Sequence, residues 1–407
     1  MSAEVRAVEH PDARGFLGAV REFTLRVRGG DLGSLPVIVG LVVIWAVFQI
    51  LNPTFLSSTN LVNLTMQSAA VGTMAIGIVL VLLLGEIDLS VGSVSGLASA
   101  ILAVGFVQLG LPLALVLLAS IVAGAVVGLA FGLLRTLFGV PSFVITLAGL
   151  LGILGLQLLV LGKTKSINIP TDSPLVQFGQ QWFLPAWLSY TLIVLSVAVF
   201  AGNQVAQSRR RTAAGLTATS VRVILVRALG LLVLLGVAAW YLNLTRGVGA
   251  PFALFLVLVV IVHFFLTRTR WGRSVFAVGG NVEAARRAGI RVNRVYISVF
   301  MLCSMFAALG GLMAASRTAA AYSSSGGGDI NLTAIAAAVI GGTSLFGGRG
   351  SAVSAVLGIL VIMSITSGLN LLFLESYVQY IVTGAVLLLA VVIDSLSRRS
   401  RAASGLA

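Results

Sequence analysis

The sequence predicts an all-α integral membrane protein with ten to twelve transmembrane helices. Of its 407 residues, 58% are hydrophobic and only 9% are charged, and the mean hydropathy is +1.08. Soluble domains are about half apolar and carry about a quarter charged residues. The composition therefore excludes a soluble globular protein and predicts a chain that crosses the bilayer many times.

Apolar runs separated by polar loops define the expected helices. A helix needs roughly 20 apolar residues to cross a hydrocarbon core of about 30 Å. Twelve candidate runs, of which the run at 332–346 is short, lie at 35–52, 63–84, 90–109, 111–134, 143–162, 185–202, 221–244, 250–267, 295–316, 332–346, 352–372 and 377–394. Together they form one transmembrane domain over residues 35–394.

Arginines in the loops predict the orientation of these runs. Residues 1–34 are polar and contain no signal peptide, so we expect them to form a cytoplasmic tail. Alternate crossing from that start places 21 of the 26 Lys and Arg residues on the cytoplasmic side, including those of a C-terminal tail at 395–407. The net charge of +14 thus reflects topology, and we expect no nucleic-acid partner because no aromatic residues are interleaved with the arginines.

Two features suggest how the transmembrane domain is organised. The runs at 185–202 and 221–244 are joined by a basic, Ser/Thr-containing stretch, which predicts an inserted helical hairpin over 185–244. Two Gly-rich stretches, 85–92 and 341–351, fall on the same predicted side and align with four identities. A parallel internal repeat would explain both observations.

The polar stretch at 268–294 is expected to carry a short helix on the membrane surface. Its seven arginines cannot enter lipid cheaply. Asn281 suits the N-cap, Glu283 the positive end of the helix dipole, and Gly289 the position after the helix end. Charge alone fits equally well a basic loop that only sets the orientation of the chain.

The stretch GEIDLSVG, from Gly85 to Gly92, contains two carboxylates between apolar runs. In a continuous helix, Glu86 and Asp88 would point about 200° apart and could not act as an acid/base pair. Two interpretations stay open. The segment is a break in a helix that lines a transport path, or it is a short loop in which Asp88 or Ser90 caps the next helix.

Together these motifs resemble those of the permease subunits of bacterial sugar-importing ABC transporters, the ribose/xylose/arabinose permease family. E-A-A-x-x-x-G, starting at Glu283, is similar to the loop that docks on a separate ATPase subunit. G-x-I-D-L-S-V-G, starting at Gly85, resembles a hallmark in which a second Gly commonly stands where this chain has Glu86. The stretches 140–147 and 332–351 match the family in the expected order, and the long tail and the hairpin are most similar to the xylose type.

The resemblance implies alternating access by a homodimer that works with two ATPase subunits and a periplasmic or lipid-tethered sugar-binding protein. ATP and Mg²⁺ would be held by the ATPase, so this chain is expected to bind no cofactor and to catalyse no reaction. ATPase coupling is assigned by the resemblance to Gly279, Gly280, Asn281, Glu283, Ala284, Ala285, Arg286, Arg287 and Gly289. Helix breaks along the path are assigned to Gly85, Glu86, Asp88, Ser90, Gly92, Gly341, Gly342, Thr343 and Ser344.

Uncharged polar side chains within the runs suit a neutral cargo such as a pentose. The candidates, which are equally explained by helix-to-helix bonds or core packing, are Gln67, Ser142, Phe143, Thr146 and Asn370. The loops at 164–181 and 317–331 would form either a landing surface for the binding protein or plain exposed loops. The expected location is the bacterial inner membrane.

A second class of function is kept as an alternative. An ion-coupled secondary transporter of a small neutral metabolite would use Glu86 and Asp88 as ion ligands, which requires a carboxylate at bilayer depth. Both carboxylates fall at a predicted helix end. A metal centre is not expected, because the chain has one cysteine and two histidines. The Gly162-Lys163-Thr164 triplet lacks the earlier glycine of a P-loop.

Overall fold

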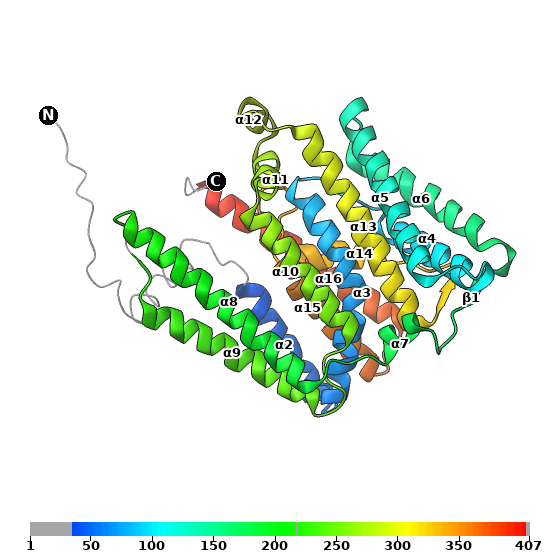
Figure 1. The fold of residues 1–407 in the computed structure, drawn as a ribbon, viewed down its shortest axis with the longest axis horizontal. Coiled ribbons are helices and arrows are strands. Elements are labelled where there is room, and N and C mark those ends of the chain that lie inside the picture. The colour runs from blue at the N-terminus through cyan, green and yellow to red at the C-terminus, as the bar shows by residue number, and fades with distance from the viewer. Residues whose placement is uncertain (1–34, 217, 404–407) are drawn as a thin grey trace. The chain divides into compact units, whose positions relative to one another are not determined.

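The computed structural model describes residues 35–216 and 218–403, and these residues are almost entirely helical (Figure 1). Contacts divide the described chain into two compact units. The hairpin unit contains residues 184–216 and 218–247, and the core unit contains residues 35–183 and 248–396. The predicted N-terminal tail at 1–34 lies outside the described residues.

Nine helices within the described ranges are long and apolar enough to cross a membrane, which confirms the all-α membrane fold. They are α3 (Ser58–Leu83), α4 (Val91–Ala103, continued by the π-helical η1, Val104–Gln108), α5 (Leu113–Phe138), α6 (Ser142–Leu161, followed by η2, Gly162–Thr164), α8 (Ala186–Ala213), α9 (Val221–Asn243), α10 (Ala250–Arg268), α13 (Val292–Thr318) and α15 (Val353–Leu371).

Three further helices complete the apolar pattern. α2 (Leu35–Leu51) and α14 (Ile330–Ile340) are shorter, and α16 spans Ser376–Ala403. The 11 residues of α14 rise only about 16 Å, so the run predicted at 332–346 is a half-length helix and not a span. Helix α16 continues to Ala403, so residues 395–403 of the predicted C-terminal tail are helical, and the cytoplasmic location of that tail stays a prediction.

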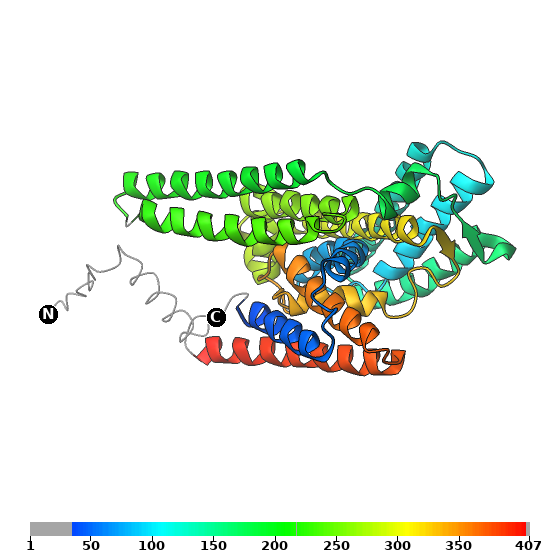
Figure 2. The same cartoon turned by 90° about the horizontal axis from the view of Figure 1, so that it is seen from below.

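The hairpin unit consists of two antiparallel helices, α8 and α9, drawn in green in Figures 1 and 2. The short connection between them is closed by a hydrogen bond from Ser208 Oγ to the Thr219 carbonyl, at 2.9 Å. Exposed leucines and valines cover both helices, among them Leu195, Val199 and Leu234. Such surfaces suit lipid. The two helices therefore agree with the predicted hairpin, whereas its origin as an insertion stays a prediction.

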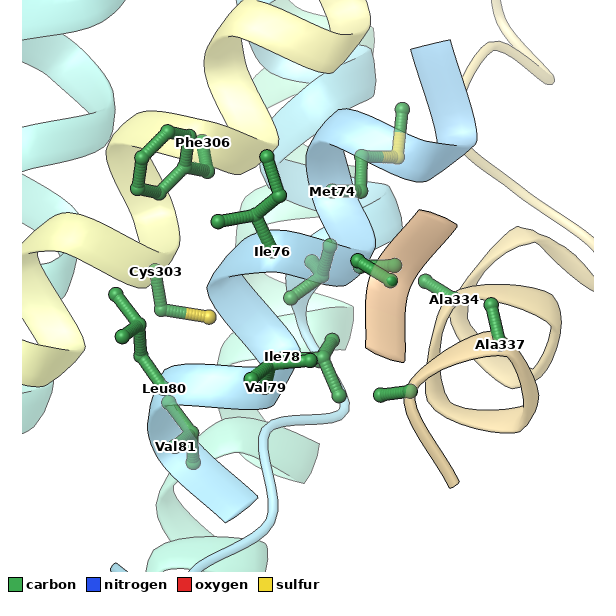
Figure 3. Close-up of a cluster of buried hydrophobic side chains, with 14 of the residues drawn as sticks. Met74, Ile76, Ile78, Val79, Leu80, Val81, Cys303, Phe306, Ala334 and Ala337 are labelled. Atoms are coloured by element: carbon green, nitrogen blue, oxygen red, sulfur yellow. The ribbon is translucent and has the colours of Figure 1, made fainter. Parts of the chain in front are cut away.

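Helix α3 forms the centre of the core unit. Its side chains from Met74 to Val81 pack against Cys303 and Phe306 of α13 on one side and against Ala334 and Ala337 of α14 on the other (Figure 3). Because α3 is apolar on every side from Met74 to Leu83, this half of the helix is stable only when other helices surround it. Its burial explains why no polar face is visible in its sequence.

Helices α5 and α13 approach each other through a stripe of small residues. Gly124, Gly128 and Gly132 recur every four residues, and a Cβ at Gly124 would lie 2.6 Å from the Ser304 carbonyl oxygen of α13. Small residues at this spacing allow helix backbones to pack closely in a membrane. The four-residue spacing of these glycines is visible in the sequence and is a signal that was missed.

The core unit has an end at which α7 (Pro174–Gln180) lies, the α7 end, and an opposite end at which α12 (Val282–Arg287) lies, the α12 end (Figure 1). Two loops meet at the α7 end. Strands β1 (Ser166–Asn168) and β2 (Ala320–Tyr322) pair antiparallel, with Ile167 opposite Ala321. The ribbon joins the two loops for which the sequence left open either a landing surface for the binding protein or plain exposed loops. Gln157, which is buried, donates from Nε2 to the Ser325 carbonyl at 3.0 Å and to the Tyr322 carbonyl at 3.2 Å.

Candidate functional site

The surface helix predicted within 268–294 is present as α12 (Val282–Arg287). Asn281 is its N-cap and accepts a hydrogen bond from the Ala284 N–H at 2.9 Å, and Gly289 has a φ of +80° just beyond the helix. Both features are confirmed. Glu283 pairs with Arg286 at 3.1 Å, a solvent-exposed contact that contributes little to stability.

A second helix within this stretch was missed. α11 (Arg270–Gly280) follows α10 after one residue, Thr269, whose hydroxyl accepts from the Gly272 N–H at 3.2 Å. Gly272, Val275 and Val278 recur every three residues and are buried. That spacing marks the apolar side of a short amphipathic helix, but the surrounding arginines obscured it.

Most of α12 is presented to solvent. Ala285 is buried, while Glu283, Ala284, Arg286 and Arg287 are exposed, as are Asn281, Gly280 and Gly289. Ala285 packs into the hydrophobic core, and its carbonyl accepts a hydrogen bond from the Ile290 N–H at 3.1 Å that closes the C-terminal end of the short helix. Seven of the nine residues predicted for ATPase coupling are thus exposed, Gly279 and Ala285 being the exceptions, and the coupling role of the set stays a prediction.

Beside α12, three chain segments meet through glycines, and we call this contact the glycine junction (Gly85, Gly279, Gly347 and Gly348). The Gly348 N–H donates to the carbonyl of Leu83 at 2.9 Å. A Cβ at Gly279 would overlap that same carbonyl oxygen. The two Gly-rich stretches, which were predicted to lie on the same side of the membrane, therefore contact each other close to the base of α12. The internal repeat itself stays a prediction.

The segment after Gly85 is extended and runs along the first turns of α6. The Ile87 N–H donates to Ser142 Oγ at 3.3 Å, and the Leu89 N–H donates to Thr146 Oγ1 at 3.1 Å. These two hydroxyls replace the hydrogen bonds that a helix would supply to the backbone. Ser142 and Thr146 are thus engaged with the break in the chain, and a contact with cargo stays a prediction.

Asp88 is 1% exposed and lies inside the core unit, not at an exposed helix end. Its Oδ1 accepts from the Ser90 N–H at 2.8 Å and from Ser90 Oγ at 2.7 Å. Its Oδ2 has no N–H or O–H donor among the described residues, and the Cys303 thiol faces the carboxyl. Burial raises the pKa of Asp88, and the bonds from Ser90 partly oppose that rise.

The expected capping of α4 by Asp88 or Ser90 is wrong. Ser90 occupies the N-cap position but makes no side-chain bond to the helix. Instead, Asn331 of α14 accepts a hydrogen bond from the Gly92 N–H through Oδ1. Asn331 was missed because its partner lies 239 residues away in the sequence.

Glu86 has a specific partner. Arg135, in the last turn of α5, donates to Glu86 Oε1 from Nε and Nη2, both at 2.9 Å. The Arg135 guanidinium also lies over the Tyr296 ring, 5.2 Å from its centroid. In the sequence, Arg135 is one of many arginines that indicate orientation, so the grouping of Arg135 with Glu86 and Tyr296 is a finding of the structure.

The remaining candidates occupy different places. Asn370 accepts from Gln379 Nε2 at 2.6 Å, and Gln379 lines a cavity of about 200 Å³ between α3, α14, α15 and α16. Gln67 is half-buried on α3, four residues before the cavity-lining Val71. Phe143 is 52% exposed on α6 and away from that cavity.

Polar and small residues of the 341–344 stretch lie between α14 and α15. Gly341 abuts the Ser354 carbonyl of α15, and the Ser344 N–H donates to the Arg349 carbonyl at 3.0 Å. Thr343 is buried, whereas Gly342 is exposed. These residues form a tight turn that ends the half-length helix.

This arrangement, a helical membrane protein with broken helices beside an exposed short helix, is that of a transport permease. Residues 60–391 match the family described as the branched-chain amino acid transport system / permease component, and the chain belongs to that family. The resemblance to sugar-importer permeases is confirmed by its relatives.

The xylose transport system permease protein XylH of Escherichia coli (strain K12) is 41% identical over 347 residues, which cover 85% of this chain and 87% of that protein. XylH of Haemophilus influenzae is 35% identical over 377 residues, which cover 92% of this chain and 99% of that protein. The ribose import permease protein RbsC of Bacillus subtilis (strain 168) is 32% identical over 365 residues, covering 90% and 94%. No solved structure matches the chain significantly.

Proposed function

We propose that this chain is the membrane-spanning subunit of an ATP-driven importer for a monosaccharide, most specifically a pentose such as xylose. The observation that carries the mechanism is the glycine junction, which joins the end of α11, directly before the exposed α12, to the end of α3 and to the loop that follows α14. The cargo assignment is supported by the similarity to XylH of Escherichia coli over most of both chains.

In this proposal, a separate ATPase subunit docks on α12 and holds the ATP and Mg²⁺. No cofactor is assigned to this chain, and no covalent step occurs in it. Movement of α12 is passed to the Leu83 carbonyl and to Gly348 by direct backbone contact, because side chains are absent at Gly279 and Gly348. Rigid backbone contacts transmit displacement with little loss.

The segments moved in this way are the extended stretch at 86–90 and the turn at 341–350. Their displacement would change access to the interior from the α12 end, as alternating access requires. At the α7 end, the β1–β2 ribbon and its loops are proposed to receive a sugar-binding protein. Two copies of the chain would form the complete permease, as the family resemblance implies.

The proposed orientation places the α12 end in the cytoplasm of a bacterial cell, with the chain in the inner membrane. Arg135, the arginines of α11 and α12, and Arg349 belong to segments at that end, in agreement with the positive-inside rule. The ion-coupled alternative is not favoured, because the relatives are permease components of transport systems.

Reversal of one charge on α12 tests the coupling. Glu283→Arg should abolish association with the ATPase in a pull-down from membranes, while membrane insertion and thermal stability stay unchanged because the Glu283 side chain is 65% exposed. Asp172→Arg is the matched control, since Asp172 is exposed in the loop before α7. Unchanged ATPase association of Glu283→Arg would contradict the assignment.

Uptake of labelled pentoses into proteoliposomes tests the transport function. Uptake should require the ATPase, the binding protein and ATP together, and competition among sugars should identify the cargo. Uptake by this chain alone, driven by a proton or sodium gradient, would contradict the proposal and favour the ion-coupled alternative.

A further inference from the structure

The cavity between α3, α14, α15 and α16 is lined by side chains that can hydrogen-bond. Figure 2 shows α16 (red) below α15 (orange). The cavity of about 200 Å³ is lined by residues of these two helices, of α3 and of α14 with the residue before it. Its polar lining residues include Asp329, Thr333, Thr366, Gln379, Tyr380 and Thr383. All of them belong to the core unit.

Hydroxyl groups in this protein usually bond to their own helix. Thr73 donates to the Ala69 carbonyl at 2.8 Å, and Thr267 donates to the His263 carbonyl at 2.7 Å. Such bonds satisfy a hydroxyl that has no water in the bilayer. They are the normal condition for threonine in a membrane helix.

The threonines of the cavity are different. Within the described part of the chain, the hydroxyls of Thr333, Thr366 and Thr383 make no hydrogen bond to another residue, and neither does the Tyr380 hydroxyl. Thr333 is buried and Thr366 and Thr383 are half-buried, whereas Tyr380 is 59% exposed, so a hydroxyl without a partner costs free energy at the three threonines. Their grouping around one cavity therefore indicates that water or a hydroxyl-rich molecule completes their hydrogen bonds.

The acceptors of the cavity point to the class of molecule. Asp329 precedes α14, but its carboxylate makes no capping bond to that helix and so retains both oxygens. The Gln379 amide is held by Asn370, at 2.6 Å. A carboxylate, an oriented amide and several hydroxyls on different helices are suited to bind a polyol, because the hydroxyl groups of a polyol both donate and accept hydrogen bonds.

We propose that this cavity, the hydroxyl cavity, is a water-filled station on the transport path that binds a neutral polyol, with Asp329 and Gln379 as acceptors and Thr333, Thr366 and Thr383 as mixed donors and acceptors. The identity of the polyol as a pentose rests on the proposed function. Accessibility of the cavity to water does not depend on that function.

Cysteine labelling tests the hydroxyl cavity directly. The chain has one native cysteine, Cys303, which is fully buried on α13. Thr366→Cys in the full chain, reconstituted in proteoliposomes, should react with a water-soluble maleimide, and added xylose should slow that reaction several-fold. Thr73→Cys, which replaces a buried threonine bonded within α3, should stay unlabelled. Thr383→Cys repeats the test from α16 in case one variant fails to fold.

The outcomes separate this proposal from the proposed function. Absence of labelling at both cavity positions would overturn the hydroxyl cavity, even if the wild-type importer takes up xylose. Labelling that xylose does not slow would overturn the polyol assignment. Protection by xylose in a chain that shows no ATP-dependent uptake would support the cavity while refuting the importer.

A transport measurement adds a second readout. Thr366→Val in the assembled importer should lower xylose uptake at limiting sugar by roughly fivefold, the change that loss of one neutral hydrogen bond gives. Thr267→Val, which removes a hydroxyl bonded only to its own helix, should leave uptake unchanged. Equal uptake by both variants would contradict a contact between Thr366 and the sugar.

Discussion

Replacing Gly279 with alanine inserts one methyl group between the end of α11 and the last carbonyl of α3. The new Cβ would overlap the Leu83 carbonyl oxygen and lie 2.8 Å from the Gly348 nitrogen. Both neighbours are backbone atoms, so no change of side-chain rotamer relieves the overlap. Either α11 moves away from α3, or the 2.9 Å hydrogen bond between Gly348 and Leu83 is broken.

The expected cost follows from three contributions. Overpacking a close contact costs about 1–3 kcal/mol. Loss of one backbone hydrogen bond adds about 1 kcal/mol. The higher helix propensity of alanine offsets at most about 1 kcal/mol of this destabilisation, because Gly279 lies in the last turn of α11. Gly279→Ala should therefore lower the free energy of unfolding by about 1–3 kcal/mol.

The neighbouring glycine is the matched control. A Cβ at Gly280 would meet no atom within 4 Å, so Gly280→Ala should be neutral or slightly stabilising. Thermal unfolding of the purified chain in detergent measures stability, and ATPase stimulation by the sugar-binding protein in the reconstituted importer measures coupling. Gly279→Ala should lower both, and Gly280→Ala is the control for stability alone, because Gly280 itself belongs to the residues assigned to ATPase coupling. Indistinguishable behaviour of the two variants would refute the glycine junction as a mechanical link.

Two further substitutions test the contacts around the extended segment. Glu86→Gln leaves the guanidinium of Arg135 without its carboxylate and should destabilise the protein by about 1–3 kcal/mol. A double-mutant cycle with Arg135→Gln, measured by thermal unfolding, should show coupling between the two positions. Additive effects of the two substitutions would contradict the ion pair. Asn331→Ala removes the acceptor for the Gly92 N–H and should lower the free energy of unfolding by about 1 kcal/mol. Asn243→Ala, which removes a hydrogen bond within α9 only, should lower it by less. Equal losses of stability would contradict capping of α4 by Asn331.

The local features of this protein were readable from its sequence. Apolar run length predicted the long helices, and the cap residues Asn281 and Gly289 predicted the limits of α12. Each depends on residues close together in the chain. Even so, α11 was overlooked within a basic stretch, and the run at 332–346 was too long by the turn that follows Ile340.

The candidate site depended on partners that lie far apart in the sequence. Glu86 and Asp88 were visible as carboxylates, but neither the ion pair with Arg135 nor the burial of Asp88 beside Cys303 follows from their spacing. The unbonded threonines of the hydroxyl cavity look identical in sequence to threonines that bond to their own helix. Only the packed structure distinguishes them.

The sequence by itself determined the class of protein, its helices and its family, because lipid requires apolar runs of sufficient length and helix ends require particular residues. The tertiary structure alone decided where the helices break, which glycines touch, and which polar groups face a cavity. Those features arise when backbones from distant segments approach within hydrogen-bonding distance. Hydropathy describes only the local sequence, so it does not predict which distant segments meet.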